Sequence, residues 1–234
     1  MSTKNESVKI THAEGTFQGY LAIPEKTPAP GVIVVQEIFG VNSHIRSVCD
    51  RLAQAGYLAL APDMFWRIKP GFQSGYSPDE IKAGLVLKEQ TTVAQAMADV
   101  DAAMGVIRAR KELKGKSLGI TGFCWGGLIT FLAACKFPFA CAASFYAGGI
   151  ANFLGEAKHL HGPILFHFGE QDHAIPLTDV DKVREAVKGH PAAEVFVYTG
   201  AQHGFHCDAR GSYHEPSAKQ AWTRTMELFK RHLG

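Results

Sequence analysis

Short apolar runs alternate with amphipathic helical patterns along most of this chain, and this alternation restricts the possible fold more than any other feature. Residues 32–37 (VIVVQE) and 118–123 (LGITGF) are examples of runs with the length and residue types of buried strands. Between them, residues 89–110 repeat apolar side chains at spacings of three and four, as an amphipathic helix does. Strands that alternate with helices form parallel βαβ units, so we expect an α/β fold with a mostly parallel, doubly wound sheet and helices on both faces.

The predicted elements follow one another with short connections. Strands are expected at residues 8–10, 17–23, 32–37, 57–63, 118–123, 141–146, 164–168 and 195–198. Helices are expected at residues 43–55, 89–110, 125–136, 178–188 and 217–232, and residues 67–78, rich in glycine and proline, are expected to form a loop. No stretch resembles an interdomain linker, so we predict a single domain over residues 1–234.

The composition is that of an ordinary globular protein, with 46% hydrophobic and 20% charged residues and a formal net charge of +2. This balance favours neither nucleic acid nor an anionic membrane as a partner. The apolar runs are far too short to span a membrane, and the polar residues 1–15 lack the apolar core of a signal peptide. The five cysteines form no CxxC pair, so free thiols in a reducing cytoplasm are expected.

Residues 122–126 read Gly-Phe-Cys-Trp-Gly and join a predicted strand directly to a predicted helix. The pattern G-x-C-x-G is the cysteine form of the nucleophile elbow of α/β-hydrolases, a strained turn that raises the nucleophile above the sheet edge. The glycines allow close passage of the chain, and the helix N-terminus favours a thiolate and an oxyanion. Cys124 is therefore the candidate nucleophile, and the Trp125 N–H group a candidate oxyanion-hole donor. The alternative is a small buried hydrophobic residue, which is what most free cysteines are.

Two later loops carry groups that would activate this thiol. Asp172 follows the strand at 164–168, and His203 follows the strand at 195–198. The chain order nucleophile, acid, histidine is the order of α/β-hydrolases, and the carboxyl ends of parallel strands meet at one edge. In this triad Asp172 orients the imidazole and His203 accepts and returns protons. Glu170, in the same loop as Asp172, is the alternative acid.

A metal site is a second interpretation of the region around His203. The potential ligands within twelve positions are His203, His206, Cys207 and His214. Zinc uses three or four such ligands, yet no matching pair at regular spacing occurs elsewhere in the chain. Neither a metal nor any other cofactor is therefore expected.

Glu37 ends the run at residues 32–37 and would also lie at the ligand-binding edge. A carboxylate there would adjust the protonation of the thiol, and the alternative is a solvated charge on a loop. The next N–H group, that of Ile38, is the candidate second oxyanion donor, because the loop after this strand supplies that donor in the α/β-hydrolase fold.

Five segments together resemble the dienelactone hydrolase family: QEIFGVN, APDMF, GFCWGG, GEQDHAIP and QHGFHCDARGSYHEPSAKQAW. The resemblance covers nearly the whole chain and implies the α/β-hydrolase fold. It also implies hydrolysis of cyclic enol lactones, typically dienelactone to maleylacetate in the breakdown of chlorinated aromatics. Residue by residue, it implies Cys124 as nucleophile, Asp172 and His203 as its partners, and Glu37 as the group that controls the thiol. In that family the resting cysteine is neutral, and substrate binding lets the glutamate accept the thiol proton.

The chain departs from this family in the groups that hold the substrate carboxylate, which are two arginines in the well-studied members. The stretch before the elbow reads SPDEIKAGLVLKEQ and contains no arginine. Shortly after His203 the near positions are His206 and Cys207, and Arg210 comes later. The replacement is open between Lys82, Lys88 and Arg210, each of which is otherwise a solvated surface charge. The residues expected to contact the substrate are Phe39, Trp66, Tyr146, Phe205 and Arg210.

These patterns predict a cytoplasmic, cofactor-independent hydrolase of enol lactones or related small esters, acting through a Cys-His-Asp triad and a thioester acyl-enzyme. Its partner is a small ester or lactone, and either a monomer or a small homo-oligomer is compatible with the sequence. Two alternatives stay open: a carboxylesterase or thioesterase on the same triad, and a non-catalytic, redox-sensing α/β protein in which Cys124 is the switch.

Overall fold

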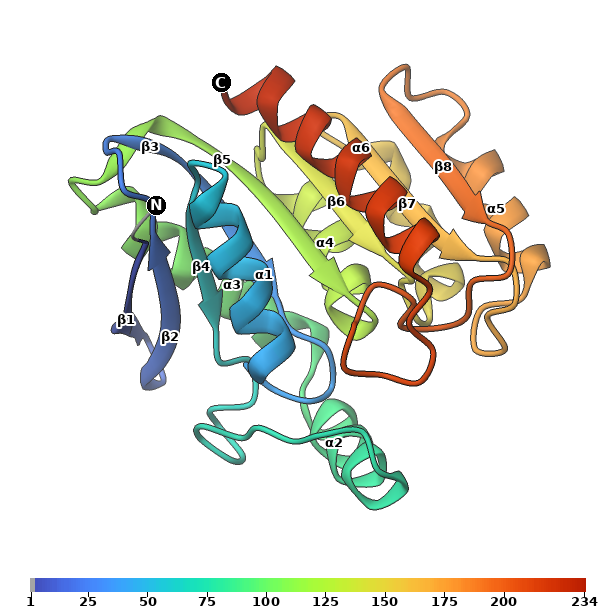
Figure 1. The fold of residues 1–234 in the computed structure, drawn as a ribbon, viewed down its shortest axis with the longest axis horizontal. Helices are drawn as coiled ribbons and strands as arrows, with labels where there is room; N and C mark the ends of the chain where they lie inside the picture. The colour runs from blue at the N-terminus through green and yellow to red at the C-terminus, as the bar shows by residue number, and fades with distance from the viewer. Residues whose placement is uncertain (1–2) are drawn as a thin grey trace. The chain divides into compact units, whose positions relative to one another are not determined.

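The computed structural model describes residues 3–234, in which strands and helices alternate along most of the chain (Figure 1). The strands are β1 (Lys4–His12), β2 (Gly15–Ile23), β3 (Ala29–Val35), β4 (Leu58–Pro62), β5 (Leu113–Phe123), β6 (Cys141–Phe145), β7 (Ile164–Gly169) and β8 (Ala193–Tyr198). The helices are α1 (Ser43–Gln54), α2 (Pro78–Gln90), α3 (Val93–Arg108), α4 (Trp125–Lys136), α5 (Leu177–Val187) and α6 (Glu215–Leu233), with a 3₁₀ helix η1 at Ile150–His159.

The strands are hydrogen-bonded in the order β1-β2-β4-β3-β5-β6-β7-β8. The pairs β3–β4, β6–β7 and β7–β8 are parallel, whereas β1–β2 and β2–β4 are antiparallel. The prediction of an α/β fold with a mostly parallel sheet is confirmed. It follows from strands such as β3, β6 and β7, in which every residue is buried, because a strand covered on both faces needs apolar side chains on both.

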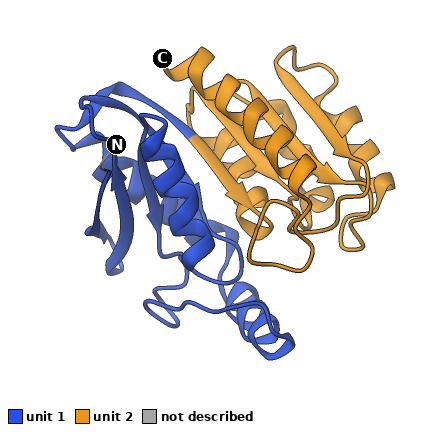
Figure 2. Cartoon of the chain, viewed as in Figure 1, with its two compact units in different colours: residues 1–119 blue, residues 120–234 orange. Residues whose placement is uncertain are grey.

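The chain forms two compact units, residues 1–119 and residues 120–234, and β5 contributes to both (Figure 2). The single domain over residues 1–234 stays a prediction. Within the first unit, α1 and α3 both pack against β4 and lie on opposite faces of the strands (Figure 1). Within the second unit, α6 packs against β6 on one face, and α4 packs against β6 on the other (Figure 1).

The helix expected over residues 89–110 is present as α3, which begins four residues later than expected and ends two residues earlier. The sequence does not predict α2, which is separated from α3 by a short break at residues 91–92. Each of the two helices begins with a capping box. The hydroxyl of the first residue accepts from the backbone N–H three residues later, and the side chain of that later residue accepts from the backbone N–H of the first. The pairs are Ser77 with Glu80 and Thr92 with Gln95. Most of α2 lies at residues 79–88, for which no element is expected from the sequence, and it buries only Gly84 and Leu87.

Two smaller differences affect the surroundings of the predicted site. The strand expected at 32–37 ends at Val35, so Glu37 lies two residues beyond it, in the connection to α1. The segment at residues 150–159, for which no element is expected from the sequence, forms η1. In the described part of the chain, no helix is both long and apolar enough to cross a membrane.

Candidate active site

Cys124 occupies the corner between β5 and α4, where its backbone has φ 55° and ψ −120°. A positive φ is uncommon for a residue with a side chain and costs free energy that the surrounding structure must supply. Here the Cys124 N–H donates to the Phe145 carbonyl at 3.0 Å, and the Cys124 carbonyl accepts from Gly127 at 2.9 Å. The strained corner is therefore fixed from both sides, by β6 and by the first turn of α4.

The glycines beside Cys124 are required by close contacts rather than by turn chemistry. A Cβ atom added at Gly122 would overlap the carbonyl oxygen of Gly126, and one added at Gly127 would overlap the carbonyl oxygen of Phe145. Since these are backbone atoms that cannot easily move aside, only glycine fits. The expectation that the corner needs glycines is thereby given a physical cause.

Asp172 and His203 lie in the loops that leave β7 and β8, two neighbouring parallel strands. His203 Nδ1 and Asp172 Oδ2 are 2.8 Å apart. The other carboxylate oxygen of Asp172 accepts from the N–H groups of Ala174 at 2.9 Å and Ile175 at 3.1 Å. The Asp172 side chain is fully buried and the His203 side chain is 19% exposed, so the carboxylate is held inside while the imidazole reaches the surface.

The electrostatics of His203 connect it with Cys124. Burial lowers the pKa of the imidazole, but the negative charge of Cys124 and the hydrogen bonds and charge of Asp172 outweigh burial, and the pKa is raised to about 10. Because Nδ1 is occupied by Asp172, Nε2 is the ring nitrogen available to the Cys124 sulfur. Cys124, His203 and Asp172 are thus brought together in the order that the sequence predicts.

Cys124 also differs from the other cysteines in exposure, since it is partly exposed and the other four are buried. Burial raises the pKa of Cys135, with a contribution from Glu156, and that of Cys141, each to about 12, and it raises the pKa of Cys49 further. These three thiols stay neutral at physiological pH and pack as small hydrophobic residues, as the sequence suggests.

Tyr146 and Phe205, two predicted substrate contacts, pack against the imidazole side of the site. The rings of Tyr146 and His203 have centroids 5.2 Å apart in an edge-on arrangement, and those of Tyr146 and Phe205 are 5.3 Å apart. Both aromatic side chains are fully buried, and Tyr146 has a positive φ of 35°. Tyr146 thus packs on His203 and Phe205 packs on Tyr146, and contact of either with a substrate stays a prediction.

Arg210 lies against the residue that follows the histidine. A Cβ atom added at Gly204 would overlap the Arg210 guanidinium, so this cation packs on the backbone next to His203. The other two candidates for the missing carboxylate-binding group lie on α2 in the first unit, where Lys82 is exposed and Lys88 is half-buried. Of the three, Arg210 is the one within the unit that holds Cys124.

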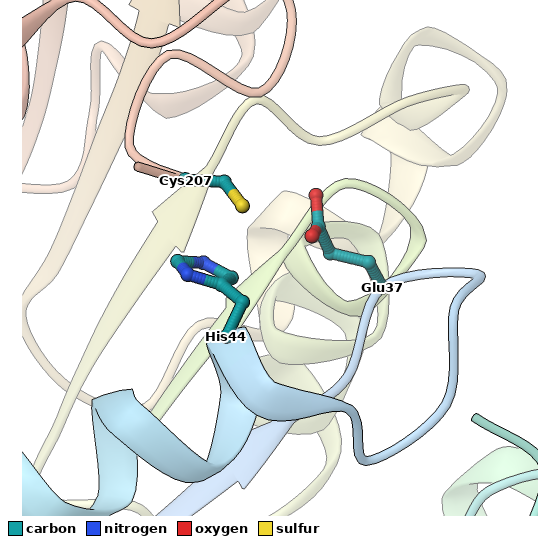
Figure 3. A group of neighbouring side chains, drawn as sticks. All are labelled: Glu37, His44 and Cys207. Atoms are coloured by element: carbon teal, nitrogen blue, oxygen red, sulfur yellow. The ribbon is translucent and has the colours of Figure 1, made fainter. Parts of the chain in front are cut away.

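Three predicted site residues in the first unit follow β3 directly. Glu37, Ile38 and Phe39 are all buried, and the Glu37 side chain has no exposed surface. The alternative that Glu37 is a solvated loop charge is therefore wrong. His44, in the first turn of α1, is also buried, and one of its ring nitrogens lies within 4.8 Å of a Glu37 carboxylate oxygen (Figure 3). Nothing in the sequence singles out His44, because its nearness to Glu37 arises from the loop between β3 and α1.

Trp66, the remaining predicted substrate contact, has well-defined partners in the first unit. Its ring stacks on Phe17 at 5.0 Å, its Nε1–H donates to the buried Asp99 at 3.0 Å, and the Arg67 guanidinium lies 4.3 Å from its ring centroid. These contacts attach the segment after β4 to β2 and α3. A role of Trp66 in a substrate pocket stays a prediction.

The histidines considered as zinc ligands have separate partners. His203 is bonded to Asp172, His214 Nδ1 is 2.7 Å from Ser217 Oγ, and His206 stacks on Phe123 at 5.1 Å. Each of these three histidines is thus held by a different neighbour. The contact of His203 with Asp172 is of the kind that a catalytic acid makes with its histidine.

The fold and the strand-to-helix corner with its neighbouring carboxylate–imidazole pair are those of an α/β-hydrolase, and the protein is a hydrolase. More particularly, the chain belongs to the dienelactone hydrolase family, whose model matches residues 17–233. The elbow, the acid loop and the histidine loop all lie within the matched part.

Relatives and solved structures agree with this family over nearly the full length. The chain is 38% identical over 240 residues to the "Putative carboxymethylenebutenolidase" of Synechocystis sp., with 98% of each chain covered. It is 40% identical over 228 residues to the protein of the same name from Escherichia coli, covering 92% of this chain and 82% of that one. A crystal structure from Klebsiella pneumoniae, named "Putative Dienelactone Hydrolase", has a TM-score of 0.89 at 36% identity and covers 99% and 100% of the two chains.

Proposed function

We propose that this hydrolase cleaves enol lactones of the dienelactone type, or related small esters, through a Cys124-His203-Asp172 triad. The observation that carries the proposal is the 2.8 Å contact between His203 and Asp172. The raised pKa of His203, to which Cys124 contributes, supports it. The family supports the ester or lactone class, and the relatives named as carboxymethylenebutenolidases support the lactone.

In the first half of the reaction, the Cys124 sulfur attacks the substrate carbonyl as a thiolate. The N–H groups of Trp125, at the start of α4, and of Ile38, after β3, are proposed to bind the oxyanion. The carbon–oxygen bond of the ester then breaks while the carbon–sulfur bond persists as a thioester. Because an enolate is a weak base, it departs with little help from an acid, which is why an enol ester suits a thiolate enzyme.

The second half of the reaction depends on a change in the charge beside His203. The thiolate raises the pKa of His203, and formation of the thioester removes that charge. The pKa of the imidazole therefore falls on acylation, and the imidazolium gives its Nε2 proton to the released enolate. The neutral Nε2 can then accept a proton from water while Asp172 holds Nδ1. Hydroxide adds to the thioester and the carbon–sulfur bond breaks. The products are a carboxylic acid, which loses its proton to solvent, the thiolate and an imidazolium.

Glu37 is proposed to control the protonation of the thiol between turnovers. Its burial supports a specific role, because a carboxylate is costly to bury and buried ionisable groups cluster at functional sites. A carboxylate beside the thiol would exchange a proton with it and so set how much of the sulfur is thiolate, the form whose charge raises the pKa of His203. The neutral thiol form is the slower of the two to oxidise.

The proposal is tested by a rate panel that compares an enol lactone, an aryl ester and an acyl thioester, run on wild type, Cys124→Ala and Cys135→Ala. We expect the lactone to be cleaved with the highest kcat/KM, Cys124→Ala to lose all activity, and Cys135→Ala, on the same helix but buried, to keep it. Mass spectrometry of the quenched wild-type reaction should detect an acyl group on Cys124.

Each other outcome selects a different function. A preference for aryl esters or thioesters would replace lactone hydrolysis by carboxylesterase or thioesterase activity on the same triad. Activity that persists in Cys124→Ala would exclude the cysteine as nucleophile. No activity on any substrate would favour the redox-sensing protein.

A further inference from the structure

His167 is a buried histidine that the proposed reaction does not use. It lies in the middle of β7 with no exposed surface, and its ring centroid is 4.5 Å from that of Phe145 and 5.8 Å from that of Phe196. An imidazole among aromatic rings is costly to bury unless both of its nitrogens are satisfied. Both are: Nδ1 is 2.9 Å from the Tyr198 hydroxyl, and Nε2 is 3.2 Å from Thr225 Oγ1.

The neighbours of His167 determine the direction of each hydrogen bond. The Thr225 hydroxyl donates its one proton to the Ala221 carbonyl at 2.9 Å, so it must accept from His167 Nε2–H. His167 Nδ1 therefore accepts from the Tyr198 hydroxyl, which in turn accepts from Arg224 Nη1 at 3.0 Å. The chain of bonds runs in one direction from Arg224 to Ala221 and requires a neutral imidazole with its proton on Nε2.

This polar chain joins the elements that carry the acid and the histidine. His167 is on β7, which leads to Asp172, and Tyr198 is the last residue of β8, which leads to His203. Thr225 and Arg224 are on α6, which begins where the histidine loop, residues 199–214, ends. The polar chain therefore links the strand before the acid loop to the residue that precedes the histidine loop and to the middle of the helix that follows it.

Further hydrogen bonds join the acid loop to the histidine loop between this polar chain and the site. The Glu170 N–H donates to the Tyr198 carbonyl at 3.0 Å, and the Gln171 N–H donates to the Ala201 carbonyl at 2.8 Å. A carboxylate oxygen of Glu170 accepts from the Gly200 N–H at 3.0 Å. Beyond these contacts, the next bond between the two loops is that of Asp172 with His203.

We propose that His167 is a positioning residue, which, through Tyr198 and α6, sets the placement of the His203 imidazole relative to Asp172. The inference rests on the proposed function, because it assigns a role in aligning that triad. This role explains why a polar chain lies among the aromatic rings around His167. A fully connected hydrogen-bond network specifies one arrangement of its residues, whereas hydrocarbon packing tolerates several.

The test uses two substitutions in the polar chain that remove a hydroxyl with little change of shape. Tyr198→Phe removes the donor to His167 Nδ1, and Thr225→Val removes the acceptor from Nε2. Tyr213→Phe, which changes an exposed tyrosine in the histidine loop, is the matched control. A shift of the imidazole by a fraction of an ångström should lower kcat by on the order of tenfold or more and leave KM nearly unchanged.

A spectroscopic measurement separates positioning from a merely structural role. The proton between His203 Nδ1 and Asp172 should give a downfield proton NMR resonance, assigned by its loss in His203→Gln. We expect this resonance to shift or broaden in Tyr198→Phe and Thr225→Val but not in Tyr213→Phe, and nitrogen-15 shifts in the wild type should place the His167 proton on Nε2. An unchanged resonance and unchanged kcat in folded variants whose melting temperature alone has fallen would overturn the inference. If the wild type cleaves no substrate, the proposed function fails, and the NMR resonance still decides the inference.

Discussion

Cys124 has a strained backbone conformation that a residue buried only for packing would not need. Its φ of 55° is unfavourable for a side chain, yet the backbone bonds to Phe145 and Gly127 hold it there. A cysteine that only filled space would have no reason to occupy such a corner. The strain is accounted for if the turn presents the sulfur to the imidazole and to the N-terminus of α4.

The first prediction concerns the glycine that makes this corner possible. Gly122→Ala should destabilise the protein by ~2 kcal/mol or more, because its Cβ overlaps the Gly126 carbonyl, and should reduce thiol reactivity. Gly105→Ala is the control: it lies exposed within α3 with nothing within 4 Å of the added atom, and should be stabilising by about 0.5–1 kcal/mol. Urea denaturation measures both. Equal effects at the two positions would show that the close contact at Gly122 is unimportant.

The second prediction concerns the acid. Asp172→Asn should lower kcat/KM by roughly 10² to 10⁴-fold and lower the pKa of His203, because the carboxylate both charges and orients the imidazole. Glu170→Gln, the change that the alternative assignment expects to be severe, should cost far less, since a glutamine oxygen still accepts from Gly200. Steady-state kinetics with an NMR titration of His203 measures both effects. The reverse ranking would make Glu170 the acid.

At the scale of elements, the site residues that the sequence singles out lie at strand ends. Cys124, Asp172 and His203 each lie in the connection that leaves a short apolar strand, and the ends of parallel strands meet at one edge. Their catalytic roles stay a prediction. The sequence does not single out His44 or His167, because a polar contact between elements far apart in sequence leaves no local pattern. Neither α2 nor the exact start of α3 is predicted, although the pairs Ser77–Glu80 and Thr92–Gln95 have capping-box spacing. The reason for α2 is that it buries only Gly84 and Leu87 and so has no apolar stripe to reveal it.

The third prediction tests whether the capping box separates these helices. Thr92→Ala removes the hydroxyl that accepts from the Gln95 N–H at 3.2 Å, and should lower the free energy of unfolding by about 1 kcal/mol. Thr223→Ala, at an exposed position within α6, should change it by less than ~0.5 kcal/mol, because no cap is lost there. Urea denaturation of the two variants gives the comparison. No loss in Thr92→Ala would show that packing alone determines where α3 begins.

At the scale of the whole molecule, folding shifts the pKa values of two histidines in opposite directions. Burial and the charge of Arg224 lower the pKa of His167 to about 3, whereas Cys124 and Asp172 overcome burial to raise that of His203 to about 10. Relative to an unfolded pKa of 6.5, neutral His167 stabilises the fold at neutral pH and loses this as the pH falls towards 3. Protonated His203 stabilises the fold below 6.5, and this contribution is lost as the pH rises towards 10.

The fourth prediction is the resulting dependence of stability on pH. The free energy of unfolding of the wild type should fall on both sides of neutrality, with each histidine contributing at most about 1.4 kcal/mol per pH unit. His167→Gln should flatten the acid side between pH 6.5 and 3, and His203→Gln the alkaline side between pH 6.5 and 10. Urea denaturation across this range, with the exposed His232→Gln as control, measures both slopes. If His167→Gln keeps the wild-type acid slope, protonation of His167 is not what destabilises the fold in acid, and the directional chain from Arg224 to Ala221 does not hold a neutral imidazole.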